Sequence, residues 1–190
     1  EPQRVAKEKD VIYMPVQMPK CFIGFKEKNP SRQGKELLER ELAISILLDL
    51  MFGQSSKNYE TLLNEGLIDH TFSFDYTAEN GFGFSMIGGD TKYPDKLAKT
   101  LKAMIESFKL EEMDDERIER IIKKKIGSFL RALNSPEYIA NQFTRYQFNG
   151  MNLFDTVPAL EKMPKQVLLE ALSDHFDFKQ MTVCQVKPEG

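Results

Sequence analysis

The most constraining feature of this 190-residue sequence is a long helix, predicted from Lys35 to Phe52, that leaves little polar surface. Its apolar residues fall on almost every side: Leu37, Leu38, Ala43, Ile44, Ile46, Leu47, Leu48, Leu50 and Met51. A helix that is apolar nearly all round has to be covered by other elements, so it lies inside a large core. A chain of this length fits one domain and can bury such a core.

Short strand-like segments stand on both sides of this helix. Pro15 and Pro19 lack N–H donors, so the strand predicted over residues 11–18 either lies at a sheet edge or is broken. Two aromatic-rich strands separated by a turn predict a hairpin, in which Phe72, Phe74, Phe82 and Phe84 pack under helices. The full set of predicted strands covers residues 11–18, 20–27, 72–76, 82–86 and 179–186.

Amphipathic helices occupy most of the remaining sequence. They are predicted from a cap at Ser55 or Ser56 to near Gly66, and over residues 94–108, 115–134, 135–149 and 164–174. This order of elements predicts an α+β fold with a mostly antiparallel sheet covered by helices. We expect a single domain over residues 11–187, and interpret residues 1–10 as the remnant of a linker.

Composition restricts the partners and the compartment. With 26 basic and 29 acidic residues, the net charge of −3 gives no general reason to expect nucleic acid or a membrane as a partner. No segment reaches the roughly 18 apolar residues of a membrane span. Two cysteines, Cys21 and Cys184, are too few for the disulfide framework of a secreted domain, so we expect a reduced cytoplasmic setting. The chain begins at Glu1 without Met or a targeting segment, and we interpret it as a piece of a longer protein.

Residues that could carry chemistry are few. His70 and His175 belong to no spacing that would gather three zinc ligands, and we interpret each as a surface or core residue. "GGDT" (residues 88–91) lacks the ending of a phosphate-binding loop and is interpreted as a turn after a strand. The serines of "QSS" (residues 54–56) are typical helix caps, and the basic run 120–131 is typical of a solvated helix face. We therefore expect no catalytic residue and no metal site in this segment.

Two stretches carry a resemblance to a known family. "LLDLMFGQSSKNYETLLNEGLIDHTFSFDY" and "GFGFSMIGGDTKYPDKLAKTL" resemble the C-terminal half of insulinase or pitrilysin-type zinc peptidases. This family includes the mitochondrial processing peptidases, and the bacterial, largely Firmicute, branch is the most similar. The likeness covers most of residues 11–186 and implies one metallohydrolase-like half of a processing-peptidase subunit.

The resemblance also implies a division of labour. In this family the N-terminal half carries an H-x-x-E-H zinc site, and the C-terminal half forms the opposite wall of a peptide-binding chamber. Zinc is then a cofactor of the parent protein. The implied partners are the zinc half of the same chain, a homologous subunit in a heterodimer or a homodimer, and a peptide substrate.

Many relatives carry an Arg and a Tyr in this wall, which help to bind the substrate carbonyl. Here the Arg position falls on Leu62 or Leu63, and the Tyr position falls on Asp69. Neither an apolar side chain nor a carboxylate can donate a hydrogen bond to an oxyanion at neutral pH. Leu62, Leu63 and Asp69 are therefore candidate wall positions from which the family donors are missing.

Three interpretations remain open at this point. The chain is the non-catalytic half of a zinc endopeptidase, a proteolytically inactive scaffold subunit of the same fold, or an unrelated α+β binding module. An H-x-x-E-H motif with a distal Glu upstream of Glu1 would favour the peptidase, and its absence would favour the scaffold.

Overall fold

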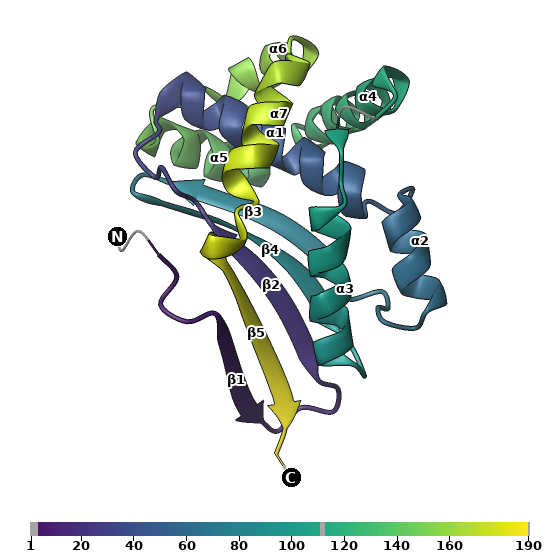
Figure 1. The fold of residues 1–190 in the computed structure, drawn as a ribbon. Helices are drawn as coiled ribbons and strands as arrows, with labels where there is room; N and C mark the ends of the chain where they lie inside the picture. The colour runs from purple at the N-terminus through teal and green to yellow at the C-terminus, as the bar shows by residue number, and fades with distance from the viewer. Residues whose placement is uncertain (1–3, 111–112, 190) are drawn as a thin grey trace.

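The computed structural model describes residues 4–110 and 113–189. Its centre is a five-stranded sheet in the order β1-β5-β2-β4-β3 (Figure 1). β1 pairs with β5 in parallel, and the other three pairs are antiparallel. The strands are β1 (Lys9–Met14), β2 (Lys20–Lys26), β3 (Ser73–Glu79), β4 (Phe82–Asp90) and β5 (Met181–Pro188). The predicted α+β fold, the mostly antiparallel sheet and the edge position of the first strand are confirmed.

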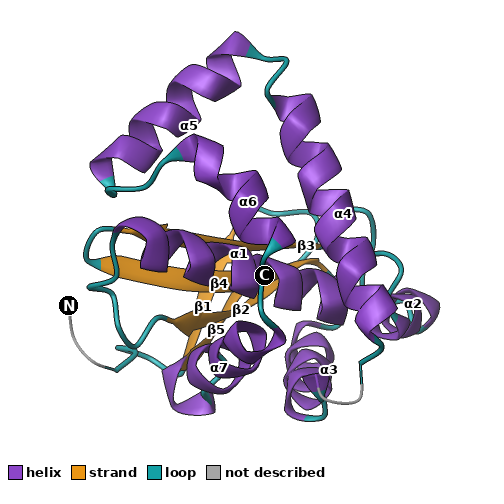
Figure 2. Ribbon diagram, turned by 90° about the horizontal axis from the view of Figure 1, so that it is seen from above, coloured by secondary structure: helices purple, strands orange, loops and turns teal. Residues whose placement is uncertain are grey.

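Seven α-helices lie within the described ranges. They are α1 (Gly34–Phe52), α2 (Lys57–Asn64), α3 (Pro94–Glu106), α4 (Asp115–Ala132), α5 (Pro136–Phe148), α6 (Thr156–Glu161) and α7 (Lys165–His175), with short 3-10 turns η2 (Leu153–Asp155) and η3 (Phe178–Gln180). Figure 2 shows α4 and α5 diverging from a shared connecting loop, with α6 between them. No helix in the described part of the chain is both long and apolar enough to cross a bilayer.

Helix α1 forms the middle of the core, as its sequence predicts. It contacts α7, β3, α4, α2 and α6, which together cover almost its whole circumference. Nine of its apolar side chains are at most 1 % exposed: Leu38, Ala43, Ile44, Ile46, Leu47, Leu48, Leu50, Met51 and Phe52. The basic run of α4 is not only a solvated face, because Lys124 and Lys125 contact the Asp49 carboxylate of α1 at 2.9 and 3.1 Å.

The hairpin forms as predicted, but one of its strands presents the opposite face. β3 and β4 are antiparallel neighbours, and Phe74 packs against the core from β3. On β4, however, Phe82 and Phe84 are 38 % and 43 % exposed, while the intervening Gly83 and Ser85 are buried. The expectation that Phe82 and Phe84 pack under helices is therefore wrong.

At the N-terminal end of β4, the buried face of the strand has no room for aromatic rings. A Cβ atom placed on Gly83 would lie 3.1 Å from the Glu27 Cβ and 3.3 Å from the Tyr76 hydroxyl. These polar side chains belong to a buried cluster that fills the space under the hairpin. The small residues therefore face inward, and the large apolar ones face away from the helices.

Substitutions on the two faces of β4 should change the free energy of unfolding by different amounts. Ile87 is fully buried, so Ile87→Val should lower the free energy of unfolding by about 0.5–1.5 kcal/mol. Phe84→Ala on the exposed face should change it by no more than about 0.5 kcal/mol in the isolated chain. Urea denaturation of both variants measures the difference, and equal losses would contradict the assigned faces.

Candidate functional site

The segment that follows α1 is built around a helix cap. Ser56 is buried, and its Oγ accepts a hydrogen bond from the Tyr59 backbone N–H at 3.0 Å at the start of α2. A serine at this position satisfies one of the free N–H groups of the first helical turn. The capping role predicted for the Ser-Ser pair is thus confirmed for Ser56.

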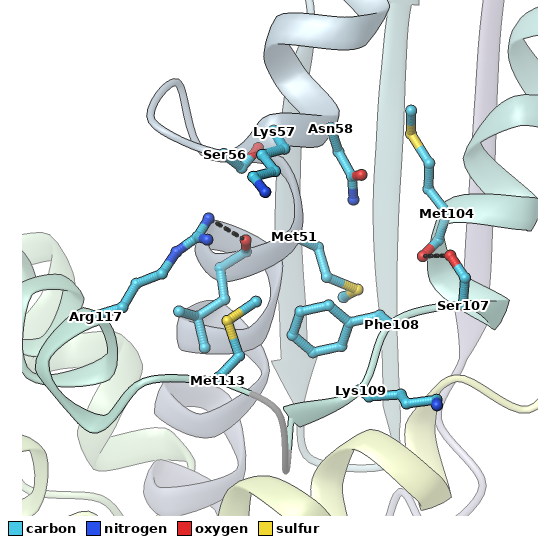
Figure 3. Close-up of a pocket in the computed structure, with 11 residues that line it drawn as sticks. Met51, Ser56, Lys57, Asn58, Met104, Ser107, Phe108, Lys109, Met113 and Arg117 are labelled. Carbon is cyan, nitrogen blue, oxygen red and sulfur yellow. Dashed lines mark hydrogen bonds between the residues drawn. The ribbon is translucent and has the colours of Figure 1, made fainter.

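A pocket of about 310 Å³ opens beside this cap, between α1, α2 and the ends of α3 and α4. Figure 3 shows Met51, Phe108 and Met113 forming an apolar floor, with Lys57 and Arg117 at the rim. The Arg117 guanidinium donates to the Leu50 backbone carbonyl at 3.4 Å. The Ser56 hydroxyl caps α2, and the Ser107 hydroxyl donates to the Met104 backbone carbonyl. The described lining therefore offers no nucleophile–base pair.

The three candidate wall residues do not converge on one site. Leu62 is fully buried under α2, whereas its neighbour Leu63 points outward and is 48 % exposed. Asp69 lies in the loop after α2, where its Oδ1 accepts hydrogen bonds from the Thr71 N–H at 2.8 Å and the Thr71 hydroxyl at 2.6 Å. These bonds hold the pKa of Asp69 below its usual range, so Asp69 is an ionised acceptor.

The loop carrying Asp69 is tied to the end of β4. The Thr71 hydroxyl accepts a bond from the Asp90 N–H at 2.8 Å. Gly89 allows this approach, since a Cβ there would lie 2.9 Å from the Phe72 Cα. Gly88 lies equally close to β2, because a Cβ there would lie 2.0 Å from the Cys21 carbonyl oxygen. "GGD" is therefore the final part of a strand at a close backbone approach, not the turn that we predict from the sequence.

A buried polar cluster, which sequence reasoning missed, lies at the other end of the hairpin. The Glu27 carboxylate accepts two hydrogen bonds from the Arg40 guanidinium at 2.9 and 3.0 Å, and one from the Tyr76 hydroxyl at 2.9 Å. Arg40 also contacts Asp174 at 2.9 Å. The cluster joins β2, β3, α1 and α7 where these elements meet.

His175 extends this cluster to β4. Its Nε2 lies 2.8 Å from the Ser85 hydroxyl, and its Nδ1 lies 3.4 Å from the Glu27 carboxylate. This order of hydroxyl, imidazole and carboxylate is similar to a hydrolase triad, but Ser85 and His175 are 0 % and 1 % exposed. A nucleophile has to reach its substrate, so the arrangement is structural.

Comparison with known proteins places the chain in a family. The sequence profile of the family described as "Peptidase M16 inactive domain" matches residues 1–125. Over all 190 residues, the chain is 50 % identical to the uncharacterized zinc protease YmfH of Bacillus subtilis, of which it covers 44 %. The chain belongs to the M16 inactive-domain family. It spans less than half of the length of this relative.

Solved structures give the same assignment. An M16-like peptidase from Alicyclobacillus acidocaldarius matches 99 % of the chain with 31 % identity and a TM-score of 0.91, and the match covers 45 % of that protein. The inactive peptidase domain of a Bordetella parapertussis protein has the same fold, with a TM-score of 0.74 at 14 % identity. The match covers 94 % of this chain and 95 % of that one. The family resemblance seen in the sequence is confirmed.

Two ionisable groups make the folding of this M16 domain sensitive to acid. Burial lowers the pKa of His175 despite the opposing effect of the neighbouring Glu27 carboxylate. Burial alone would raise the pKa of Glu27, but its neighbours, His175 and Arg40 foremost, hold that pKa far below the usual range. Each group takes up a proton at a higher pH in the unfolded chain than in the folded one. Folding stability therefore falls as the pH falls.

The contribution of His175 can be measured with His175→Gln, whose amide can still bond to Ser85 but does not titrate. The free energy of unfolding of the natural chain should decline below about pH 6.5, where an unfolded histidine takes up a proton. Between about pH 6.5 and 5 its slope should exceed that of the variant by up to about 1.4 kcal/mol per pH unit. Urea denaturation at several pH values gives both slopes. Equal slopes would show that folding does not change the affinity of His175 for a proton.

Proposed function

We propose that this chain is the non-catalytic C-terminal domain of a zinc-dependent endopeptidase. It forms the wall of a peptide-binding chamber opposite the zinc-bearing half. The observation that carries the proposal is the 50 % identity, over the full chain, to a protein named as a zinc protease and more than twice as long. Together with the match to an inactive-domain family, this identity supports a parent in which another segment holds the zinc.

The chemistry of the described residues fits a parent protein in which the zinc site lies outside this domain. No group of three or more His, Cys, Asp or Glu side chains among them could hold a metal ion. The wall positions offer the buried Leu62, the exposed Leu63 and the ionised Asp69, none of which donates a hydrogen bond. The domain would therefore shape a chamber and contact a peptide, while zinc in the N-terminal half would activate the attacking water.

A second candidate is a proteolytically inactive scaffold subunit of the same fold. The missing donors at Leu62, Leu63 and Asp69 favour it, because a scaffold does not have to stabilise a tetrahedral intermediate. The content of the upstream sequence separates the two candidates, since only a peptidase needs zinc ligands there.

Zinc content and cleavage test the proposal directly. The full-length parent should hold about one zinc ion per chain and cleave unfolded peptides once its partners are present. The 190-residue chain alone should do neither. Elemental analysis after dialysis and a peptide-cleavage assay give both readings, and chelator-treated parent is the control. A zinc-free parent with no cleavage under any condition would favour the scaffold.

The parent is also proposed to be a cytoplasmic protein. The free thiols of Cys21 and Cys184 suit a reducing compartment. Its proposed partners are the N-terminal half of the same chain, a homologous subunit or a second copy, and a peptide substrate.

A further inference from the structure

The pocket at the start of α2 has basic residues, but no described acidic residue, in its lining. Lys57, Lys109 and Arg117 line this hollow of about 310 Å³ (Figure 3), and we call it the basic pocket. The cavity of about 510 Å³ beside α6, by contrast, is lined by acids and bases together, among them Asp155 and Lys162. Opposite charges in one lining offset each other, whereas a concave lining of one sign concentrates counter-ions. The basic pocket therefore attracts an anion.

Two of these cations lack a carboxylate partner in the described part of the chain. There the Lys57 ammonium takes part in no hydrogen bond or ion pair, and the same is true of the Asn58 side-chain amide. The Arg117 guanidinium makes one bond, to the Leu50 carbonyl at 3.4 Å, and has five N–H donors. Figure 3 shows the ends of Lys57 and Asn58 pointing from α2 toward the apolar floor. The basic pocket therefore offers donors that the described residues do not use.

The position of Lys57 is unfavourable for the helix that carries it. Lys57 is the first residue of α2, where the helix dipole favours a negative charge and disfavours a cation. The N–H groups of this first turn have no intrahelical partner, and the Ser56 hydroxyl satisfies that of Tyr59. Helix stability therefore gives no reason for a lysine here. A residue that breaks a local rule without a structural gain is typical of a functional site.

An apolar floor lies under these donors. It is formed by Met51, which is fully buried, and by Phe108 and Met113, which are partly buried and pack against the core. The flexible thioether side chain of methionine adapts its shape to the group that it contacts. A volume of about 310 Å³ is at the small end of the range for ligand pockets, so an apolar group that reaches this floor is short. The pocket thus combines a cationic rim with room for one short apolar group.

We propose that the basic pocket binds a small carboxylate with a short apolar tail. Lys57 and Asn58 donate hydrogen bonds to the carboxylate, and Arg117 provides a second positive charge. The tail packs on Met51 and Phe108. An inorganic anion would leave this apolar floor uncovered, and an uncharged apolar ligand would leave the donors unused. A short fatty acid and the apolar C-terminal residue of a peptide share this chemistry. The site needs neither zinc nor the N-terminal half, so it is independent of the proposed peptidase function.

Nuclear magnetic resonance of the chain with isotope-labelled methionine methyl groups tests the site. Hexanoate, which has both a charge and a tail, should shift the methyl signals of Met51 and Met113. The signals of Met14 and Met86, which are exposed on β1 and β4, are the controls and should not move. Hexanol has no charge and acetate has no tail, so each should bind at least about tenfold more weakly than hexanoate.

Equal binding of hexanoate and hexanol would overturn the proposal, because the cations would then contribute nothing. Equal binding of hexanoate and acetate would overturn it as well, since the apolar floor would have no role. The absence of saturable hexanoate binding at concentrations up to about 10 mM would have the same consequence.

A matched pair of variants assigns the binding to Lys57. Lys57→Gln should weaken hexanoate binding about tenfold, because a hydrogen bond to a charged group is lost. Lys99→Gln removes the same charge from an exposed lysine of α3 outside the pocket, and it should change the affinity less than about twofold. Equal losses in the two variants would show that hexanoate responds only to the net charge, and would overturn the site.

Asn58→Asp separates binding from folding. The new carboxylate repels hexanoate, so the affinity should fall at least as far as in Lys57→Gln. An acid in the first turn of α2 suits the helix dipole, so the urea midpoint of the unliganded variant should stay the same or rise. Undiminished hexanoate binding by this stable variant would contradict the assigned position of the carboxylate.

N-acetyl-leucine and its amide distinguish the two sources of the ligand, because they reproduce the end of a peptide with and without its charge. Tighter binding of N-acetyl-leucine than of hexanoate assigns the pocket to a peptide C-terminus, and the reverse order assigns it to a short fatty acid. If the amide binds as tightly as the acid, the pocket does not recognise a carboxylate and the proposal is wrong.

Discussion

Replacing Glu27 by Gln is expected to lower the free energy of unfolding by about 3–5 kcal/mol, the usual cost of removing one member of a buried ion pair. Glu27 accepts bonds from Arg40, Tyr76 and Arg32, and it is only 4 % exposed. The amide keeps the shape of the side chain but not its charge. Among the described residues, Arg40, itself 7 % exposed, would keep the half-buried Asp174 as its one counter-charge.

Urea denaturation monitored by circular dichroism measures this loss. The control is Glu39→Gln on α1, because Glu39 pairs with the exposed Lys35 at 3.6 Å and should contribute no more than about 1 kcal/mol. If Glu27→Gln cost no more than the control, Asp174 alone would be sufficient to balance the arginines. The cluster would then have no central residue.

The buried position of this cluster explains why the sequence correctly predicts which residues of β3 face the helices but not which residues of β4 do. The alternation of apolar and polar residues in the first strand of the predicted hairpin correctly places Phe72 and Phe74 toward the helices. On β4 the alternation is equally clear, but it does not determine whether the large apolar residues or the small residues face inward. The usual rule that aromatic residues face the core fails because the polar side chains of Glu27 and Tyr76 occupy the space above Gly83.

The burial of α1 is predictable because it depends on one continuous segment. Its composition requires a covered position, whichever elements provide the cover. The cluster depends on residues that are far apart in the sequence, such as Glu27, Ser85 and His175. Arg40 gave no signal of the cluster, because it stands between Glu39 and Glu41, and an arginine with such neighbours is normally exposed.

The wall residues show the limit of reasoning from family resemblance. Matching the pattern identifies Leu62, Leu63 and Asp69, but not what their side chains contact. In the structure Leu62 faces the core and Asp69 is held by Thr71, so the three positions do not form one surface. The loop has a role of its own, in that Thr71 connects Asp69 to the end of β4.

The same residues lead to the prediction with the largest functional effect. In the proposed peptidase, a peptide held by the zinc half develops negative charge on its carbonyl oxygen in the transition state. Loss of one hydrogen-bond donor at such an oxygen typically costs about 10²–10³ in kcat. The ionised Asp69 cannot supply the bond, and neither leucine carries a donor. The zinc-bearing parent should therefore cleave peptides very slowly by itself.

Addition of a homologous subunit that carries an Arg and a Tyr at the matching positions should raise kcat by at least about 10²-fold, since that subunit supplies the missing donors. The assay compares cleavage by the purified parent with and without the homologue, at equal zinc content. The matched control is the homologue with its Arg and Tyr replaced by Leu and Asp, the residues found here. It should still associate with the parent but leave the rate low. Full activity of the parent alone would contradict the division of donors between subunits, and the carbonyl would then have to be bound by other residues of this domain or of the zinc half.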